Sequence, residues 1–141
     1  MPSDRALKAV NAVHRALLRA TRGRIGGRAK NMPVLELVTT GRKSGARRSV
    51  LLTSPLQEGN TFVVVASRGG DDHHPSWYLN VVAEPSVEVV IGGRSRPMRA
   101  SVPTGDERAR LWTAVTTRHP HYAGYQRRTE REIPIVVLTP T

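Results

Sequence analysis

The feature that most constrains the fold of this chain is a series of six short apolar stretches, separated by glycine, proline and charged turn residues. Each has the length of a strand, and all except residues 95–102 are rich in β-branched residues. The first three follow one another at hairpin spacing, which favours antiparallel pairing. The six stretches are VLELVTT (34–40), RSVLLTS (48–54), TFVVVAS (61–67), SVEVVI (86–91), SRPMRASV (95–102) and IPIVVLT (133–139).

Helical periodicity appears in only three places. Apolar residues recur every three or four positions over residues 3–20, a short helix is predicted over residues 74–84, and Thr104 with Glu107 has the spacing of a capping box for a helix over residues 105–117. Strands and helices do not alternate strictly, and Pro97 implies an edge strand or a bulge. We therefore predict an α+β, mainly antiparallel barrel or sandwich rather than a doubly wound sheet.

The charge of the chain predicts an anionic partner. There are 22 basic and 11 acidic residues among 141, for a formal net charge of +11. Nucleic acid, an anionic lipid surface and a phosphorylated small molecule all fit this balance. The absence of cysteine and of any long apolar run leads us to expect an intracellular, cytoplasmic protein.

One group of positive charges lies in the stretch TTGRKSGARRSV, residues 39–50. Arg42, Lys43, Arg47 and Arg48 lie within it, with glycines and without an acidic residue. Side chains of like charge repel one another at this spacing, so the loop is either left in water or offered to an anion. Glycine lets backbone N–H groups approach such an anion closely, and arginine can bind phosphate through two hydrogen bonds.

Four separated stretches together resemble the deazaflavin-dependent nitroreductase family of actinobacteria. They are TTGRKSGARRSV, FVVVASRGGDDHHPSWYLNVVAEPSVEVVIGG, TGDERARLW and YAGYQRRTEREIPIVVL. The resemblance covers residues 34–138. It implies a split β-barrel of about six strands, with an N-terminal helix and two or three flanking helices, that binds coenzyme F420. This coenzyme is an 8-hydroxy-5-deazaflavin that carries a phosphodiester and an oligoglutamate tail.

The resemblance also implies the site residues. The basic loop is expected to bind the anionic tail, and the second block is expected to face the ring; the family often has lysine in the place of Arg68. The predicted cofactor-binding residues are Arg42, Lys43, Ser44, Arg48, Ala66, Ser67, Arg68, Gly69, Trp77 and Asn80.

The predicted catalytic residues are Ser67, Tyr122 and Tyr125, which would stabilise or protonate a small planar electrophile after hydride transfer. A quinone, an enone or a nitro compound would suit such a site. Because His119 stands where some members have a third tyrosine, the resemblance leaves open whether the chain reduces nitroimidazoles.

Other interpretations of the same residues stay open. Trp77 on a helix is equally compatible with packing in the core. A carrier of F420 without turnover would keep the basic loop, and a nucleic-acid-binding domain would explain the charge, although six aromatic residues leave little for base stacking. His73, His74, His119 and His121 lack the spacing of metal ligands, so no metal site is predicted.

The N-terminal segment is predicted to form a unit of its own, with a boundary between residues 1–30 and the barrel domain of residues 31–141. Residues 1–30 contain eight basic side chains and a single acidic one, Asp4. A basic amphipathic helix either binds an anionic membrane or docks on the barrel with its charges in water. Because a lipid-soluble quinone would be met at the bilayer, the first arrangement would place the enzyme on the inner face of the membrane.

Overall fold

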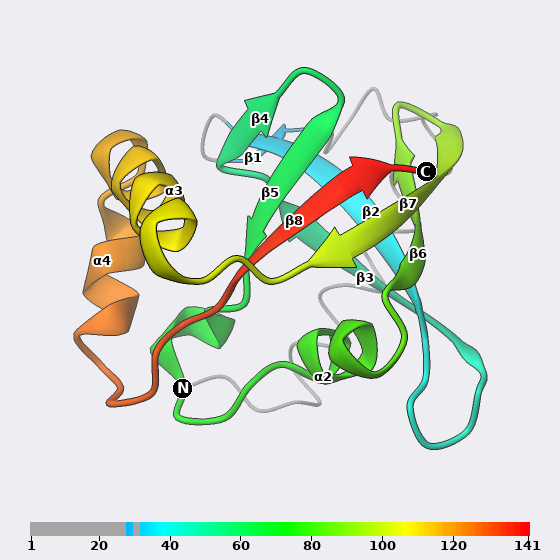
Figure 1. Cartoon of the computed structure of the whole chain (residues 1–141), viewed down its shortest axis with the longest axis horizontal. Coiled ribbons are helices and arrows are strands. Elements are labelled where there is room, and N and C mark those ends of the chain that lie inside the picture. Colours follow the sequence, from blue (N-terminus) through cyan, green and yellow to red (C-terminus); the bar gives the residue numbers. More distant parts are fainter. Residues whose placement is uncertain (1–27, 30–31) are drawn as a thin grey trace.

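The computed structural model describes residues 28–29 and 32–141, and the predicted N-terminal helix lies outside this part of the chain. Its strands form one sheet, flanked by three α-helices and a short 3-10 helix (Figure 1). The strands are β1 (Arg28–Ala29), β2 (Met32–Thr40), β3 (Arg47–Thr53), β4 (Leu56–Glu58), β5 (Thr61–Val65), β6 (Ser86–Ile91), β7 (Arg94–Ser101) and β8 (Ile135–Pro140). The helices are η1 (Arg68–Gly70), α2 (Ser76–Ala83), α3 (Gly105–Arg118) and α4 (His121–Gln126).

The sheet is antiparallel throughout its described pairings, as the hairpin spacing predicted. Strands follow the order β1-β2-β6-β7-β8-β5-β4, and β3 pairs with β2. The sheet curls around its core, but β3 and β4 do not pair with each other. This is the split barrel that the sequence resemblance implied.

The number of strands exceeds the six that the apolar stretches predicted, because β1 and β4 are too short to be recognised from composition. β4 has only three residues, Leu-Gln-Glu, and two of them are exposed. It forms the hairpin with β5 across Gly59 and Asn60, pairing Glu58 with Thr61. The third apolar stretch therefore pairs with β4 and β8 rather than with the second stretch.

Two local expectations need correction. β7 lies inside the sheet and is neither an edge strand nor bulged at Pro97, which lies opposite Glu88 of β6. Pairing of β7 with β8 begins only at Met98, so the N–H that Pro97 lacks is not needed by the ladder. Thr104 is the N-cap of α3 but makes no side-chain capping hydrogen bond. Glu107 instead accepts hydrogen bonds from Arg110.

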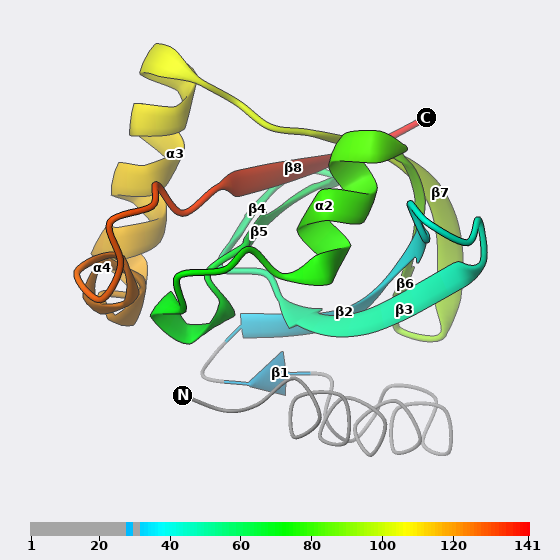
Figure 2. The same ribbon diagram turned by 90° about the horizontal axis from the view of Figure 1, so that it is seen from below.

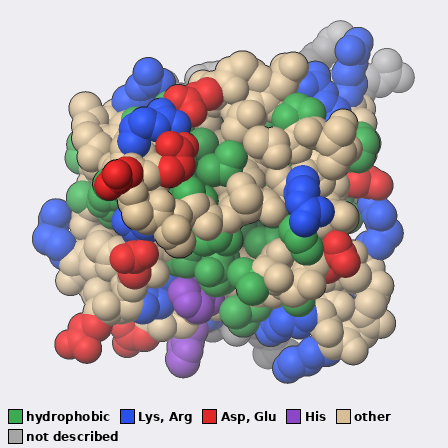
Figure 3. Space-filling view, in the orientation of Figure 1, with side chains coloured by type: hydrophobic (Ala, Val, Ile, Leu, Met, Phe, Trp, Pro, Cys, Tyr) green, Lys and Arg blue, Asp and Glu red, His purple; other side chains and the backbone are tan. Residues whose placement is uncertain are grey.

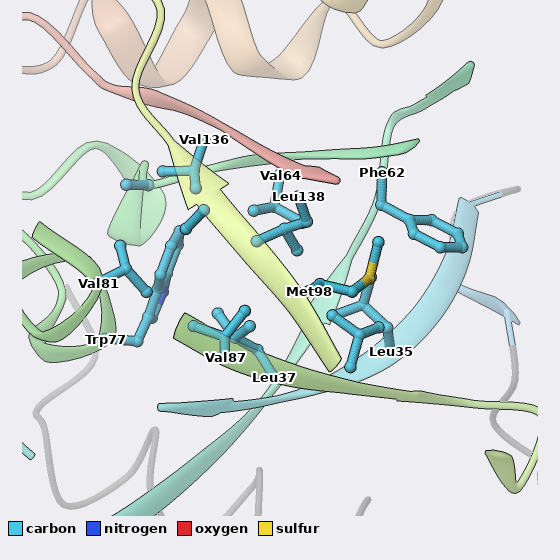
Figure 4. Packing of buried hydrophobic residues seen from close by; sticks show 13 residues of the cluster. Leu35, Leu37, Phe62, Val64, Trp77, Val81, Val87, Met98, Val136 and Leu138 are labelled. Carbon is cyan, nitrogen blue, oxygen red and sulfur yellow. The ribbon is translucent and has the colours of Figure 1, made fainter. Parts of the chain in front are cut away.

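The core consists of two apolar clusters on opposite faces of β5 and β8. Phe62 and Val64 of β5 belong to the cluster inside the barrel, whereas Val63 and Val65 belong to the cluster under α3 and α4. Burial on both faces explains why this strand is apolar at consecutive positions instead of alternating. Figure 4 shows the cluster inside the barrel, with Trp77 and Val81 of α2 at its left side.

The helices also set the layout of the candidate site. Seen from below (Figure 2), α2 covers the end of the barrel and lies between η1 and the loop that joins β2 to β3. On its other side, η1 lies against α4. The basic loop, α2, η1 and α4 therefore form one continuous row along this face.

Candidate functional site

The loop of residues 41–46, between β2 and β3, is a closed turn with its glycines at the two positions that require them. The Gly41 N–H donates to the Ala46 carbonyl at 2.7 Å, and the Gly45 N–H donates to the Gly41 carbonyl at 2.8 Å. Gly45 has a φ of +72°, and a Cβ on Gly41 would lie 3.0 Å from the Ser44 hydroxyl oxygen. The loop is thus held in a single tight shape, which presents Arg42, Lys43 and Ser44 to solvent.

Several donors of this loop have no acceptor. In the described part of the chain, the backbone N–H groups of Lys43 and Ser44 and the side chains of Lys43 and Arg48 donate no hydrogen bond. Ser44 accepts a bond from the Ala46 N–H at 3.1 Å through its hydroxyl oxygen. Successive free N–H groups beside cationic side chains are a general form of anion site.

Arg47 is separate from this group, although the sequence suggested that it extends the basic patch. Its guanidinium lies 2.8 Å from the Glu88 carboxylate on β6. The hydrogen bond from Arg47 holds the pKa of Glu88 below its ordinary value. Because its charge is already matched, Arg47 is not a candidate for binding a ligand.

Asn80 of α2 fixes the loop to the rest of the site. Its side-chain oxygen accepts from the Arg42 N–H at 3.2 Å and from the Arg42 guanidinium at 2.8 Å. Its amide group donates to the Thr39 hydroxyl at 3.2 Å, and that hydroxyl donates to the Arg48 carbonyl at 3.4 Å. Asn80 is only 4% exposed. It therefore orients the loop rather than presenting itself to a ligand.

The second half of the site is residues 66–70, which we name the β5–η1 segment. Ala66 and Ser67 are buried, and the Ser67 and Gly69 N–H groups donate to no acceptor within the described residues. Arg68 has a φ of +46°, unusual for a residue with a side chain, and it pairs with Asp71 at 3.3 Å. This segment thus combines a constrained backbone with unused donors.

The two glycines of this segment have different roles. Around Gly69 there is open space, as expected for backbone that faces a flat ligand. At Gly70, with a φ of +86°, a Cβ would lie 2.7 Å from the Tyr125 carbonyl oxygen. Gly70 therefore allows the close approach of α4, not of a ligand.

Arg131, which sequence reasoning missed, binds the backbone carbonyls of the β5–η1 segment. Its guanidinium donates to the carbonyls of Ser67 at 2.9 Å, of Ala66 at 3.3 Å and of Asp71 at 2.8 Å. It also contacts the His74 Nδ1 at 3.1 Å. In the sequence, Arg131 lies among the alternating charges of RRTERE, where nothing distinguishes it from its solvated neighbours.

Trp77 lies in the core. It is 7% exposed and belongs to the cluster inside the barrel, where Figure 4 shows its ring among Val81, Val87 and Val136. The interpretation as a packing residue therefore accounts for it fully. Any contact with a ligand would involve only its exposed edge.

Tyr122 and Tyr125 share one face of α4, as their spacing predicted, with ring centroids 5.9 Å apart. Tyr122 is 5% exposed, and its hydroxyl lies 3.3 Å from the Thr53 hydroxyl. Burial raises the pKa of Tyr122. Tyr125 is half-buried and stacks under the Arg128 guanidinium, which donates to the Gly69 carbonyl at 3.3 Å. Tyr125 is therefore the tyrosine that adjoins the β5–η1 segment.

The histidines divide between two places. His74 stacks on Tyr78 at 4.7 Å near Arg131, whereas His121 packs on Tyr122 at 4.2 Å. The described residues contain no group of three side chains that could hold a metal ion. In the orientation of Figure 1, the space-filling view of Figure 3 shows histidine at the lower edge of a hydrophobic patch.

Comparison with known proteins identifies the family. Residues 11–140 match the model of the F420H(2)-dependent quinone reductase family. The chain belongs to this family. It is 41% identical to the F420H(2)-dependent quinone reductase of Mycobacterium tuberculosis H37Rv over 131 residues, which are 90% of this chain and 87% of that protein.

Two solved structures are also similar to this chain. A structure described as the F420-H2 dependent reductase FDR-A is 41% identical, with a TM-score of 0.67, over 75% of this chain and 93% of its own. A second structure, described as a domain-swapped dimer, is 38% identical, with a TM-score of 0.70, over 90% of this chain and 93% of its own. The chain is thus an F420H2-dependent reductase with a split-barrel fold, as the sequence blocks indicated.

The described residues fit coenzyme F420. Its tail carries a phosphodiester and carboxylates, and the basic loop offers three cations without an acidic partner and two free N–H groups. Its ring offers acceptor atoms, and the β5–η1 segment offers free N–H donors beside an open glycine.

None of the helices in the described part of the chain is long and apolar enough to cross a membrane.

Proposed function

We propose that the chain reduces a quinone with F420H2, with the coenzyme lying along α2 from the basic loop to the β5–η1 segment. The observation that carries this proposal is the position of the two sets of unused donors. One set adjoins α2 at the Arg42–Asn80 contact, and the other lies in η1, which precedes α2. An elongated molecule with an anionic end and a flat polar end matches this arrangement.

The basic loop binds the anionic tail in this proposal. Arg42, Lys43 and Arg48 supply charge, and the N–H groups of Lys43 and Ser44 supply directed hydrogen bonds. Because these side chains are exposed, salt screens their attraction for the tail. We expect this loop to set affinity for the coenzyme and to leave the rate at saturating coenzyme unchanged.

The β5–η1 segment binds the ring. Ser67, Arg68 and Gly69 form its floor, and the donors of Ser67 and Gly69 fix the ring in the plane that α2 and α4 leave open. Ala66 and Trp77 support this floor from the core, since both are buried. Holding the ring still is the main contribution that a protein makes to hydride transfer from a bound cofactor.

The acceptor lies beside Tyr125. When bound, F420H2 supplies a hydride to the quinone and releases a proton, so that one quinone and one F420H2 give one hydroquinone and one F420. Tyr125 and the Ser67 hydroxyl donate hydrogen bonds to the reduced oxygen in this proposal, which stabilises the negative charge that forms there. Tyr122, whose hydroxyl is engaged with Thr53, holds Tyr125 in place.

The test is oxidation of F420H2, in excess over the enzyme, by a soluble quinone, followed by the return of fluorescence from oxidised F420. We expect multiple turnovers, with one hydroquinone formed for each F420H2 oxidised. Tight binding of F420 without turnover by any quinone, enone or nitro compound would instead support a carrier. Tight binding of flavin mononucleotide with weak binding of F420 would contradict the cofactor assignment for this chain.

We propose in addition that residues 1–30 bring the enzyme to anionic membranes, where lipid-soluble quinones reside. The basis is their sequence, with eight basic residues against Asp4. Each basic residue near an anionic surface contributes about 1 kcal/mol to binding. The full chain should co-sediment with vesicles of anionic but not of zwitterionic lipid, and a chain beginning at residue 31 should sediment with neither. Equal recovery of both chains in the supernatant would contradict membrane binding.

A further inference from the structure

The four acceptors that contact the Arg131 guanidinium all belong to one stretch, residues 66–74. The Arg131 Nε donates to the Asp71 carbonyl at 2.8 Å, and one Nη donates to the Ser67 carbonyl at 2.9 Å. The Ala66 carbonyl accepts from both Nη atoms at 3.3 Å, and the His74 Nδ1 lies 3.1 Å from one of them. A planar fork with five donors suits such divergent acceptors, whereas a lysine ammonium does not.

These contacts determine which way the segment's peptide groups point. In a trans peptide the carbonyl oxygen and the following N–H lie on opposite sides of the C–N bond. Because Arg131 holds the Ala66 carbonyl, the Ser67 N–H is directed away from Arg131. That N–H donates to no acceptor among the described residues, although Ser67 is only 8% exposed. By contrast, the Ala66 N–H donates to the Pro134 carbonyl, and the Gly70 N–H donates to the Ser67 carbonyl.

An unbonded N–H in a nearly buried residue is costly unless a ligand accepts from it. If the Ala66–Ser67 peptide turned over, a carbonyl oxygen would replace the N–H at that place and would repel an acceptor atom of a ligand. Arg131 opposes this turn because its two bonds to the Ala66 carbonyl would be lost.

We propose that Arg131 is a positioning residue for the reaction, which keeps the Ser67 N–H directed at an acceptor atom of the deazaflavin ring. This inference rests on the proposed function, because it presupposes that the β5–η1 segment binds the ring. It concerns the ring end only. The basic loop, which binds the tail, has no contact with Arg131 in the described structure.

Arg108 offers a matched control. Its side chain is also largely enclosed, donates to the Ile133 carbonyl at 2.7 Å and stacks on Trp112. It also pairs with the Glu132 carboxylate at 3.0 Å. It lies on the side of the sheet covered by α3, and its described hydrogen bond, ion pair and ring contact do not involve the β5–η1 segment. Arg108→Lys therefore makes the same substitution at a largely enclosed arginine elsewhere in the fold, although fewer hydrogen bonds are lost there than in Arg131→Lys.

The experiment is a fluorescence titration of each variant with F420 and with the tail-less 8-hydroxy-5-deazaflavin chromophore, at a temperature where thermal melts show every variant folded. Arg131→Lys should weaken binding of the tail-less chromophore about tenfold, and the ratio of the two dissociation constants should not change. Arg108→Lys should lower the melting temperature but keep chromophore affinity within about twofold. The proposal would be overturned if Arg131→Lys bound the chromophore as tightly as the wild type. It would also be overturned if Arg108→Lys lost as much chromophore affinity as Arg131→Lys. Failure of the wild-type chain to bind either compound would instead count against the proposed function.

A second pair of variants tests the N–H directly if Arg131→Lys does not fold. Ser67 has a φ of −80°, which proline tolerates. Ser67→Pro removes the N–H and the hydroxyl, whereas Ser67→Ala removes the hydroxyl alone. Ser67→Pro should bind the tail-less chromophore about tenfold more weakly than Ser67→Ala. Equal affinity of these two folded variants would also overturn the proposal.

Discussion

Asn80 accepts two hydrogen bonds from Arg42, one from its backbone N–H at 3.2 Å and one from its guanidinium at 2.8 Å. A single neutral oxygen on α2 thus sets both the course of the basic loop and the direction of its first cation. Because the amide oxygen carries no formal charge, the positive charge of Arg42 stays available to a ligand. A carboxylate at this position would still accept from Arg42 and would cancel its charge, although it could not donate to the Thr39 hydroxyl as the Asn80 amide does.

Asn80→Asp should therefore weaken binding of F420 by about tenfold or more, while leaving affinity for the tail-less chromophore unchanged. The measurement is fluorescence titration with both compounds at low salt. Asn60→Asp, at the exposed β4–β5 turn, changes the net charge equally and should leave both affinities unchanged. If the two variants behave alike, the effect belongs to overall charge and not to the contact with Arg42.

Replacement of Arg42 and Lys43 by alanine tests the basic loop itself. Each charge-assisted hydrogen bond that is lost costs about 1.5 to 3 kcal/mol, so affinity for F420 should fall by one to several decades. Turnover at saturating F420H2 should persist, and added salt should weaken binding of the wild-type chain more than that of the variant. The control is the double replacement of Arg94 and Arg96, two exposed cations of β7 near the Gly92–Gly93 turn. A dissociation constant unchanged by loss of Arg42 and Lys43 would exclude the loop as the tail site.

The sequence alone was sufficient for the parts of the fold that rest on continuous apolar runs. The buried strand Thr61–Val65 and the helix Ser76–Ala83 lie where residue pattern placed them, because burial and periodicity are local in sequence. β4 was missed because three residues, two of them exposed, carry no such pattern. Its existence depends on pairing with β5.

Only part of the candidate site could be predicted from the sequence. Clustered charge and glycine revealed the basic loop, since both properties lie within a few residues. Nothing local separated Arg47, matched by Glu88 on another strand, from Arg42. Arg131 was missed for the same reason, because its acceptors lie more than fifty residues earlier in the chain.

The two tyrosines of α4 should respond differently to the loss of their hydroxyls. Tyr125→Phe should lower turnover about tenfold with F420 affinity within about twofold, because the hydrogen bond to the reduced acceptor strengthens in the transition state. Tyr122→Phe should instead cost about 1 kcal/mol of unfolding free energy, because the Thr53 hydroxyl loses its partner. Steady-state rates and denaturant unfolding of both variants separate these effects. Equal loss of turnover without loss of stability in Tyr122→Phe would place both hydroxyls at the acceptor.

The contact between His74 and Arg131 should make the stability of the chain depend on pH in a defined window. Burial, and then the nearby Arg131 charge, lower the pKa of His74 from the ordinary 6.5. The unfolded chain therefore takes up a proton at His74 as the pH falls through about 6.5, before the folded chain does, so protonation favours unfolding. The groups that face the ring are Arg131 and Tyr78. The melting temperature of the wild-type chain should fall between pH 7.5 and pH 5.5, and His74→Gln, whose amide oxygen still accepts from Arg131, should fall less. His73→Gln, at the exposed neighbouring position, should follow the wild type. Parallel curves for the wild type and His74→Gln would show that His74 carries no pH-dependent stability.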